Sequence, residues 1–386
     1  MGERLLIVGA SGRAAAASAI RAGFEPFVID LFADADTKRL CPVLRCSFDD
    51  YPHGFIELAK QAPPGPWMYT GGLENYPDVV DAISEIRPLW GNPPAVLNQF
   101  RDPFRLSELL SVKGLNHPLP LSAGTELPND RRWVRKPIRG SAGIGIRFTN
   151  PHDVPETGDS HFFQAFVPGR AMSLLLATFA PGSQLLGYTA QLVGTRWLHA
   201  QPFHYAGTIG PVPTTGLDMQ DVHLSAFRFG DRTNLRGLGN IDFIHDGEWS
   251  HVIEVNPRYP ASAEVIELAT GVRTLDWHRK GFFRHLEPPA PTPPTRIVGK
   301  GVYYAARPIP FPMSGPWDES LARCTDVWRR PDYADIPEPG TLIEPGQPVF
   351  TLFAAAATEA ECIHQLKAKA AATDRLFGIP TPEDEP

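Results

Sequence analysis

The chain has 386 residues, of which 42% are hydrophobic and 20% charged, and its formal net charge is −7. This length supports two or three domains with proper cores, and the acidic balance gives no electrostatic case for a nucleic-acid partner. No apolar run reaches the roughly 20 residues of a membrane helix, and the chain starts in a strand pattern without a cleavable leader. We therefore expect a cytoplasmic protein with no membrane partner.

The first segment alternates strands and helices. Leu5–Gly9 is an apolar strand typical of a parallel sheet covered on both faces, and Phe27–Asp30 and Trp67–Thr70 follow as further strands. This pattern predicts a Rossmann-like α/β domain over residues 1–98. A nicotinamide site is one reading of such a domain, since Asp30 lies near the expected acidic position. The turn after the first strand, however, lacks the full Gly-x-Gly-x-x-Gly fingerprint.

Two polar residues, Glu74 and Asn75, follow the end of a strand of this domain. Ligands bind beyond the carboxyl ends of the strands in open α/β sheets, so both are candidates to bind an amine or hydroxyl of a substrate. The alternative for Asn75 is that it caps the helix that begins near Pro77.

A helix is predicted from Asp102 to Gly114. Asp102 is a good N-cap, Pro103 suits the first helical position, and a glycine at the end is a common stop signal. Arg101 and Arg105 lie on either side of this start.

A glycine-rich turn joins two short strands, Trp133–Ile138 and Ile146–Phe148. Backbone N–H groups of such a turn can close over phosphates, because no Cβ blocks the approach. Lys136 would supply a compact positive charge for a phosphate oxygen. The turn is not a P-loop, since it lacks the Gly-Lys-Ser/Thr ending and a following helix. The candidate residues of the turn are Gly140, Ser141 and Gly143.

An extended apolar run at residues 161–169 precedes a strand at Ser173–Thr178. A segment lined with phenylalanines can offer backbone donors and acceptors to a flat heterocycle and pack against its face. The alternative is an ordinary buried strand. The candidate residues of this region are Gln164, Ala165, Phe166, Val167 and Ser173.

A β-hairpin carries the clearest set of oxygen donors in the chain. Glu254 and Asn256 lie two residues apart and therefore point to the same face. A three-residue loop, Asp246–Glu248, would place Asp242 opposite Val252 and on that same face. Clustered carboxylate and amide oxygens suit Mg²⁺, which prefers oxygen ligands. The alternative is an edge hairpin with one solvated face.

Beyond the hairpin, Arg258 is followed by an entry loop and a helix predicted over Ala263–Ala269. Tyr259 and Ser262 of this loop are candidates for substrate contact, although Ser262 is also a good N-cap.

A proline-rich stretch predicts a stiff linker at residues 287–295. Residues 296–386 then read as a small C-terminal α/β module with a long helix at Glu359–Phe377.

The order of these motifs resembles that of the ATP-grasp superfamily of ADP-forming ligases. The most specific part is Ile253–Arg258, and the resemblance covers roughly the first three quarters of the chain. It implies a two-lobed α+β ATP-grasp domain over residues 99–286. The small lobe would span about residues 115–167 and the large lobe about residues 170–286.

By this resemblance, ATP and Mg²⁺ are the expected cofactors. Lys136 and the Gly140–Gly145 loop look like the phosphate-binding elements, and Gln164–Val167 like the strand that binds the adenine edge. Arg258 looks like the cation that meets the transferred phosphate or the acyl substrate. The implied magnesium ligands are Asp242, Glu254 and Asn256.

The N-terminal domain of similar proteins forms one wall of the substrate cleft. This similarity implies that the loop with Ser11 and Arg13 faces the acceptor substrate. The chain departs from the family at Pro103, where many members have a lysine that touches the nucleotide. Arg101 or Arg105 can supply the missing charge, and the sequence does not choose between them.

The implied activity is an ATP-dependent ligation of a carboxylate to an amine through an acyl phosphate, in amino-acid or coenzyme biosynthesis. The expected partners are small-molecule acid and amine substrates, and a homodimer is compatible with the sequence. The alternatives are a nicotinamide-dependent oxidoreductase and a non-catalytic ATP-binding regulatory protein.

Overall fold

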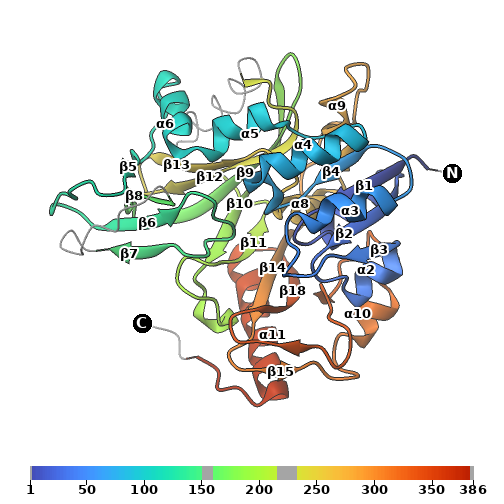
Figure 1. Ribbon diagram of the computed structural model, residues 1–386. Helices are drawn as coiled ribbons and strands as arrows, with labels where there is room; N and C mark the ends of the chain where they lie inside the picture. Colours follow the sequence, from blue (N-terminus) through green and yellow to red (C-terminus); the bar gives the residue numbers. More distant parts are fainter. Residues whose placement is uncertain (1, 150–159, 215–232, 383–386) are drawn as a thin grey trace.

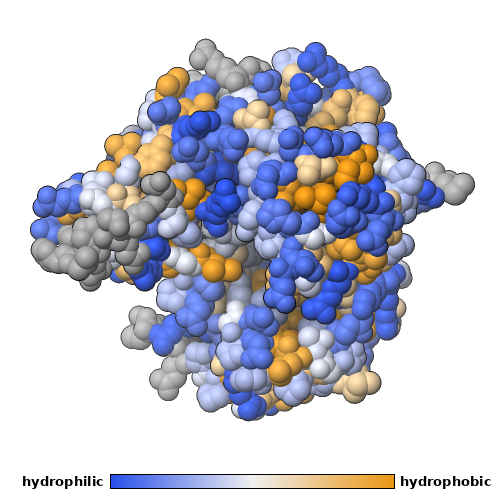
Figure 2. Space-filling model, viewed as in Figure 1, coloured by the Kyte–Doolittle hydropathy of each residue, from blue (hydrophilic) through white to orange (hydrophobic). Residues whose placement is uncertain are grey.

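The computed structural model describes residues 2–149, 160–214 and 233–382. Figure 1 shows the N-terminal elements at the right, a small group of strands projecting at the left, and the C-terminal elements at the bottom. The same projection is visible in the space-filling view, where an indentation separates it from the C-terminal part (Figure 2). Throughout the described ranges, every helix is too short or too polar to cross a membrane.

The N-terminal domain contains a four-stranded parallel sheet with the strand order β3-β2-β1-β4. All four apolar residues of β1 after Arg4 are buried, as expected for a strand covered by helices on both faces. The predicted Rossmann-like pattern is confirmed. Its elements are β1 Arg4–Val8, α1 Arg13–Arg21, β2 Glu25–Asp30, α2 Ala35–Leu40, β3 Val43–Arg45, α3 Gly54–Gln61, β4 Trp67–Tyr69, the 3₁₀ helix η1 Leu73–Asn75 and α4 Pro77–Ile86.

Two helices, α5 (Pro94–Arg101) and α6 (Pro103–Val112), connect this domain to the next. The carboxylate of Asp102 accepts hydrogen bonds from the N–H groups of Phe104 and Arg105, so it caps α6 as predicted. Asp102 itself has an extended backbone, which separates the helix α5 from the helix α6. Arg101 therefore lies at the very end of α5.

A second, antiparallel sheet has the strand order β5-β8-β6-β7 and forms the small lobe at the left of Figure 1. In the pairing of β6 with β8, Val134 lies opposite Gln164 and Lys136 opposite Phe162. Lys136 and Gln164 therefore share one face of the sheet. The strands are β5 Leu121–Ser122, β6 Trp133–Pro137, β7 Arg147–Thr149 and β8 His161–Ala165.

The largest sheet has eight strands in the order β13-β12-β9-β10-β11-β14-β18-β16. Strand β14 pairs with β11, so residues after the proline-rich linker extend the sheet of the large lobe. The predicted linker at residues 287–295 thus lies between segments of the chain that contribute strands to the same sheet. The strands are β9 Arg170–Thr178, β10 Ser183–Val193, β11 Tyr205–Gly210, β12 Gly237–His245, β13 Ser250–Asn256, β14 Ile297–Tyr304, β16 Tyr333–Ala334 and β18 Pro348–Ala356.

Helices and short elements cover this sheet. The helix predicted at Glu359–Phe377 is α11, and it starts with a capping box between Thr358 and Glu361. The predicted helix after Arg258 is α8, which ends at Gly271 in the left-handed conformation. The remaining elements are η2 Arg196–Leu198, α8 Ser262–Thr270, α9 Thr274–Lys280, β15 Ile309–Pro310, α10 Asp318–Ala322 and β17 Leu342–Ile343.

Candidate functional site

The hairpin β12–β13 brings four oxygen-bearing side chains to one face of the large sheet. Asp242 lies directly opposite Glu254, and Asn240 lies directly opposite Asn256. Directly opposite residues share a face, as do residues two apart on one strand. The predicted alignment of Asp242, Glu254 and Asn256 on one face is therefore confirmed.

The loop length and the strand register that produce this alignment differ from the prediction. His245 pairs with Ser250, so the loop has four residues instead of three, and Asp242 does not lie opposite Val252. A regular ladder from this loop would place Asp242 opposite Ile253, on the apolar face. A β-bulge after Asp242 inserts one extra residue and restores the shared face.

The amide groups of this face hold Asp242 in place. Asn240 donates through Nδ2 to Asp242 Oδ1 (2.5 Å) and to Ser173 Oγ (2.9 Å), and Asn256 Nδ2 donates to Asp242 Oδ2 (3.0 Å). The Oδ1 atom of Asn240 is buried and has no hydrogen-bond partner among the described residues. An orphaned acceptor beside two carboxylates is what a site for a hard cation would leave.

The donor set fits Mg²⁺ rather than a softer metal. Across the described ranges, no group of three or more His, Cys, Asp or Glu side chains is arranged to hold a metal ion. The candidate site instead combines the carboxylates of Asp242 and Glu254 with amide oxygens. Oxygen-only donors of this kind suit Mg²⁺ or Ca²⁺.

The two carboxylates differ electrostatically. Burial, and then the charge of Glu254, raises the pKa of Asp242 to about 7. Burial also acts to raise the pKa of Glu254, but neighbouring cations, Arg101 first, outweigh it and leave this pKa below its ordinary value. A bound divalent cation would relieve the repulsion between the two carboxylates.

Lys136 lies on the face of the small lobe that it shares with Gln164, within electrostatic range of Glu254. Its Nζ donates to Gln164 Oε1 (2.8 Å), and Gln164 Nε2 donates to the carbonyl of Pro118 (2.8 Å). Burial lowers the pKa of Lys136 to about 8, although the charge of Glu254 opposes this. Both ends of the Gln164 side-chain amide are thus hydrogen-bonded within the protein, so this side chain positions Lys136. The expected contact of its strand with adenine stays a prediction.

The segment that is expected to bind adenine lies at the C-terminal end of β8, and its residue Phe166 is half-buried. The N–H group of Phe166 donates to the carbonyl of Arg132 (2.8 Å), and its ring lies 6.5 Å from that of Phe203 in an edge-to-face arrangement. The flanking residues Ala165 and Val167 are also half-buried. Because the N–H of Phe166 is used within the small lobe, backbone contacts to a base would come from Ala165 and Val167.

The glycine-rich loop lies against the turn that precedes β11. The carbonyl of Ala142 accepts a hydrogen bond from the N–H of Tyr205 (3.0 Å), and Ser141 closes a turn through its carbonyl to the N–H of Ile144 (3.1 Å). Gly143 has φ +76°, and a Cβ there would lie 1.9 Å from the carbonyl oxygen of Phe203. Only glycine permits this contact between the two lobes.

Replacing Gly143 by alanine is expected to displace the loop from the large lobe. Cleavage by a protease within residues 139–145 should then become roughly tenfold faster, because the added Cβ overlaps backbone that cannot move aside. Gly145→Ala is the matched control. It has a similar φ of +80°, but its Cβ would meet nothing closer than 3.4 Å. Equal cleavage rates in the two variants would show that the contact does not hold the loop.

The η1 turn of the N-terminal domain faces the hairpin. Glu74 is buried, and its Oε1 accepts a hydrogen bond from Arg258 Nε (3.0 Å). Arg258 also donates to Asn256 Oδ1 (3.2 Å), which joins it to the oxygen cluster. Asn75 is not a helix cap, because Tyr76 occupies the N-cap position of α4 without a side-chain hydrogen bond. Both predicted residues of this turn therefore lie at the site.

The structure decides between the two arginines near Pro103. Arg101 forms an ion pair with Glu254 and donates to Asn75 and to the carbonyl of Gly140. Arg105 is exposed and lies 3.6 Å from the carboxylate of Asp102, at the start of its own helix. Arg101 thus supplies a cation to the site, and Arg105 does not.

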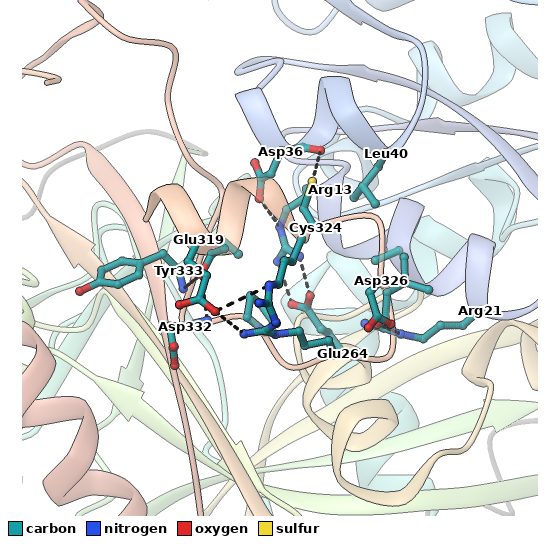
Figure 3. Close-up of a pocket in the computed structure, with 17 residues that line it drawn as sticks. Arg13, Arg21, Asp36, Leu40, Glu264, Glu319, Cys324, Asp326, Asp332 and Tyr333 are labelled. Carbon is teal, nitrogen blue, oxygen red and sulfur yellow. Dashed lines mark hydrogen bonds and ion pairs between the residues drawn. The ribbon is translucent and has the colours of Figure 1, made fainter. Parts of the chain in front are cut away.

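The expectation that Arg13 faces a substrate is wrong. Its guanidinium is buried against Glu264 (2.6 and 2.9 Å) and Asp335 (2.7 Å), and Asp36 lies 3.7 Å away. Figure 3 shows Arg13 between Asp36 and Glu264, where α1 meets the large lobe and the C-terminal segment. Its charge is balanced by three carboxylates, so it holds the parts of the protein together.

The other expected substrate residues differ in their surroundings. Tyr259 is buried, and its hydroxyl contacts Ser18 Oγ (2.7 Å) and the carbonyl of Ala14 (3.2 Å), so it packs on the N-terminal domain instead of facing the cleft. Ser262 is the first residue of α8 and does not cap it, and its buried Oγ has no partner among the described residues. Ser11 is exposed.

Two contributors to the site were missed at the sequence level. Asn240 was detectable, because it lies two residues before Asp242 and therefore on the same face of β12. Gln191 was not, since its Nε2 reaches Asp242 Oδ1 (2.8 Å) from β10, and only the register of the sheet places it there.

The residue that suggested a nicotinamide site has another role. Asp30 is fully buried, and its carboxylate accepts hydrogen bonds from the N–H groups of Gly12 (2.9 Å), Phe32 (3.2 Å) and Ala33 (2.7 Å). It closes the loops at the ends of β1 and β2 and is not available to a ribose. The geometry therefore does not favour a dinucleotide site.

Comparisons with known protein sequences match parts of the chain. A family model described as an ATP-grasp domain matches residues 101–262. An uncharacterised protein of Methanocaldococcus jannaschii is 20% identical over 278 residues, which cover 68% of this chain and 63% of that protein. The aligned region thus spans less than two thirds of the length of this curated relative.

Solved structures match along almost the whole chain. A biotin carboxylase of Campylobacter jejuni matches with a TM-score of 0.68 and 12% identity, covering 95% of this chain and 90% of that one. An L-amino acid ligase of Bacillus licheniformis matches with a TM-score of 0.64 and 16% identity, covering 96% and 97%. An N5-carboxyaminoimidazole ribonucleotide synthetase of Thermus thermophilus matches with a TM-score of 0.66 and 15% identity, covering 99% and 100%.

Proposed function

We propose that this chain, an ATP-grasp protein through its domain at residues 101–262, is an ADP-forming ligase that joins a carboxylate to an amine. The family match at residues 101–262 and the shared fold support the resemblance seen in the sequence motifs. The observation that carries the proposal is the hairpin face of Asp242, Glu254 and Asn256, with Arg258 hydrogen-bonded to it.

The proposed reaction has two steps. A substrate carboxylate attacks the γ-phosphoryl group of ATP, which releases ADP and forms an acyl phosphate. An amine then attacks the acyl carbon, and inorganic phosphate leaves with the bonding electrons while the amine loses a proton. In the first step two anions approach each other, so the site must supply positive charge as the transition state forms.

The chain offers cations from two sides. Lys136 would bind a phosphate oxygen from the small lobe, and Arg258 would meet the transferred phosphoryl group or the carboxylate from the hairpin. Mg²⁺, held by Asp242, Glu254 and amide oxygens of Asn240 or Asn256, would neutralise charge on the ATP phosphates. No side-chain nucleophile is required by this reaction.

Exclusion of water would protect the acyl phosphate from hydrolysis. The Gly140–Gly145 loop suits this role, because it already lies against the large lobe through Ala142 and Gly143. Backbone groups of Ala165 and Val167 would bind the adenine edge at the opposite end of the nucleotide. The nucleotide would thus lie between the two lobes.

The acceptor side of the site would be formed by the N-terminal domain, with Ser11 as its exposed candidate residue. Glu74 and Asn75 would contribute to it by orienting Arg258 and Arg101, to which they are hydrogen-bonded. Small-molecule acids and amines are the substrates in this proposal, in cytoplasmic amino-acid or coenzyme biosynthesis. The chain would act as a monomer or a homodimer.

The pKa of Lys136 predicts how nucleotide binding depends on pH. Only the protonated ammonium attracts phosphate, and burial lowers the pKa of this lysine to about 8. Affinity for Mg·ATP is therefore expected to fall as pH rises, by up to about tenfold for each pH unit above the pKa. Calorimetric titrations between about pH 7 and pH 9.5 would measure this. Lys136→Arg stays charged throughout, so its affinity, although weaker, should not follow the same curve.

The proposal is tested by a screen of amino acids and amines for release of phosphate from ATP. Release that requires both an acid and an amine would support a ligase, and binding of Mg·ATP without such release would favour the regulatory alternative. Stabilisation against thermal unfolding by NAD, with none by Mg·ATP, would contradict the proposal.

A further inference from the structure

We propose that Arg101 and Asn75 form a positioning pair that holds the glycine-rich loop closed against Glu254. The inference rests on the proposed function, because it assigns this loop to the nucleotide. It adds that the N-terminal domain, through Asn75, controls whether the loop is closed.

Arg101 connects two groups that belong to different lobes. Its Nη1 forms an ion pair with Glu254 Oε1 on β13, and its Nη2 donates to the carbonyl of Gly140 in the loop (2.8 Å). The Arg101 side chain is only 12% exposed, and its position at the end of α5 restricts its reach. Because one planar guanidinium makes both contacts, the position of the loop and the orientation of Glu254 depend on each other.

Asn75 fixes the guanidinium from the side of the N-terminal domain. Its Oδ1 accepts hydrogen bonds from Arg101 Nε (3.0 Å) and Nη2 (2.7 Å), and its Nδ2 donates to the carbonyl of Gly140 (3.1 Å). The carbonyl of Gly140 thus receives two donors at once. An asparagine suits this position because it has both an acceptor and a donor.

The hydrogen bonds on the Gly140 carbonyl favour a closed loop over an open one. Glu254 lies beside Asp242, and Arg101 is the cation in direct contact with it. If the loop moves away, Arg101 loses the Gly140 carbonyl, and Asn75 loses its own contact to the same atom. Opening therefore costs two hydrogen bonds on one oxygen, in addition to the contacts of Ala142 and Gly143.

The prediction is that Arg101→Gln opens the loop. Cleavage within residues 139–145 by a protease, and dissociation of a fluorescent ATP analogue with Mg²⁺, should each become about ten- to a hundredfold faster, as loss of charge-assisted hydrogen bonds implies. Arg105→Gln removes the same type of residue four positions along the chain, at an exposed site. It should change both rates less than about twofold.

Substitutions of Asn75 distinguish a positioning role from a general effect on the stability of the protein. Asn75→Ala should accelerate both rates nearly as much as Arg101→Gln, and the double variant should be no faster, because both residues act through the same contacts. Asn75→Asp keeps the acceptor for Arg101 but loses the donor to Gly140, so its rates should lie between those of the wild type and Asn75→Ala. A residue with only a structural role would instead give additive effects and no intermediate rate for Asn75→Asp.

Wild-type rates in Arg101→Gln and Asn75→Ala would overturn the inference. If Arg101→Gln does not fold, the comparison of Asn75→Asp with Asn75→Ala decides the matter. A wild-type protein that does not bind the ATP analogue would contradict the proposed function, whereas the proteolysis rates would still test the loop contacts.

Discussion

Glu254→Gln is expected to lower the rate of ATP-dependent ligation by about 10²–10³-fold. The substitution keeps the shape of the side chain but removes the negative charge that faces Asp242 across the hairpin. It also removes the ion pair with Arg101. The rate of ADP release with saturating acid and amine would measure the effect. Circular dichroism should stay as in the wild type, because the β12–β13 ladder is made by the backbone.

Glu248→Gln is the matched control for this experiment. Glu248 lies in the loop of the same hairpin and is exposed, so the same chemical change there should leave the rate within about twofold of the wild type. A wild-type rate in Glu254→Gln would show that this hairpin face does not bind the catalytic cation, and the assignment of the site would fail.

Arg258→Gln is expected to abolish ligation and to destabilise the protein. The guanidinium donates a hydrogen bond to the Glu74 carboxylate and forms an ion pair with it, and the Glu74 side chain is only 2% exposed. Removing one member of a buried ion pair leaves an uncompensated charge, which typically costs about 3–5 kcal/mol of unfolding free energy. Urea denaturation would measure the stability, and ADP release would measure the activity.

The double variant Glu74→Gln/Arg258→Gln separates these two effects. It leaves no buried charge at this position, so most of the lost unfolding free energy should return. Ligation should stay abolished, because the cation that meets the phosphoryl group or the carboxylate is still absent. Recovery of activity in the double variant would mean that Arg258 acts only through the stability of the protein.

Much of the fold could be predicted because its signals are local. The apolar strand β1, the cap at Asp102 and the helix α11 each depend on neighbouring residues, and the structure confirms all three. The strand β3 and the helix α5 were not predicted, since short strands and closely spaced helices carry weak periodic signals.

The candidate site was predicted only in part. Lys136 and the hairpin oxygens follow from spacing along the chain, and Glu74 from its place after a strand. The roles expected of Gln164 and Arg13 depended on family resemblance, and that of Tyr259 on its place in the loop after Arg258. The structure gives each of these side chains partners within the protein.

By itself, the sequence determined the order of the motifs and the face on which Glu254 and Asn256 lie, because side-chain direction alternates along any strand. Only the tertiary structure decided that a bulge brings Asp242 to that face, and that Arg101 rather than Arg105 reaches Glu254. The first outcome depends on how the two strands of the hairpin pair, and the second on how distant segments pack. A bulge forms where a loop of even length would otherwise bury a carboxylate among apolar side chains. An arginine becomes part of a site only when its helix ends beside the partner carboxylate.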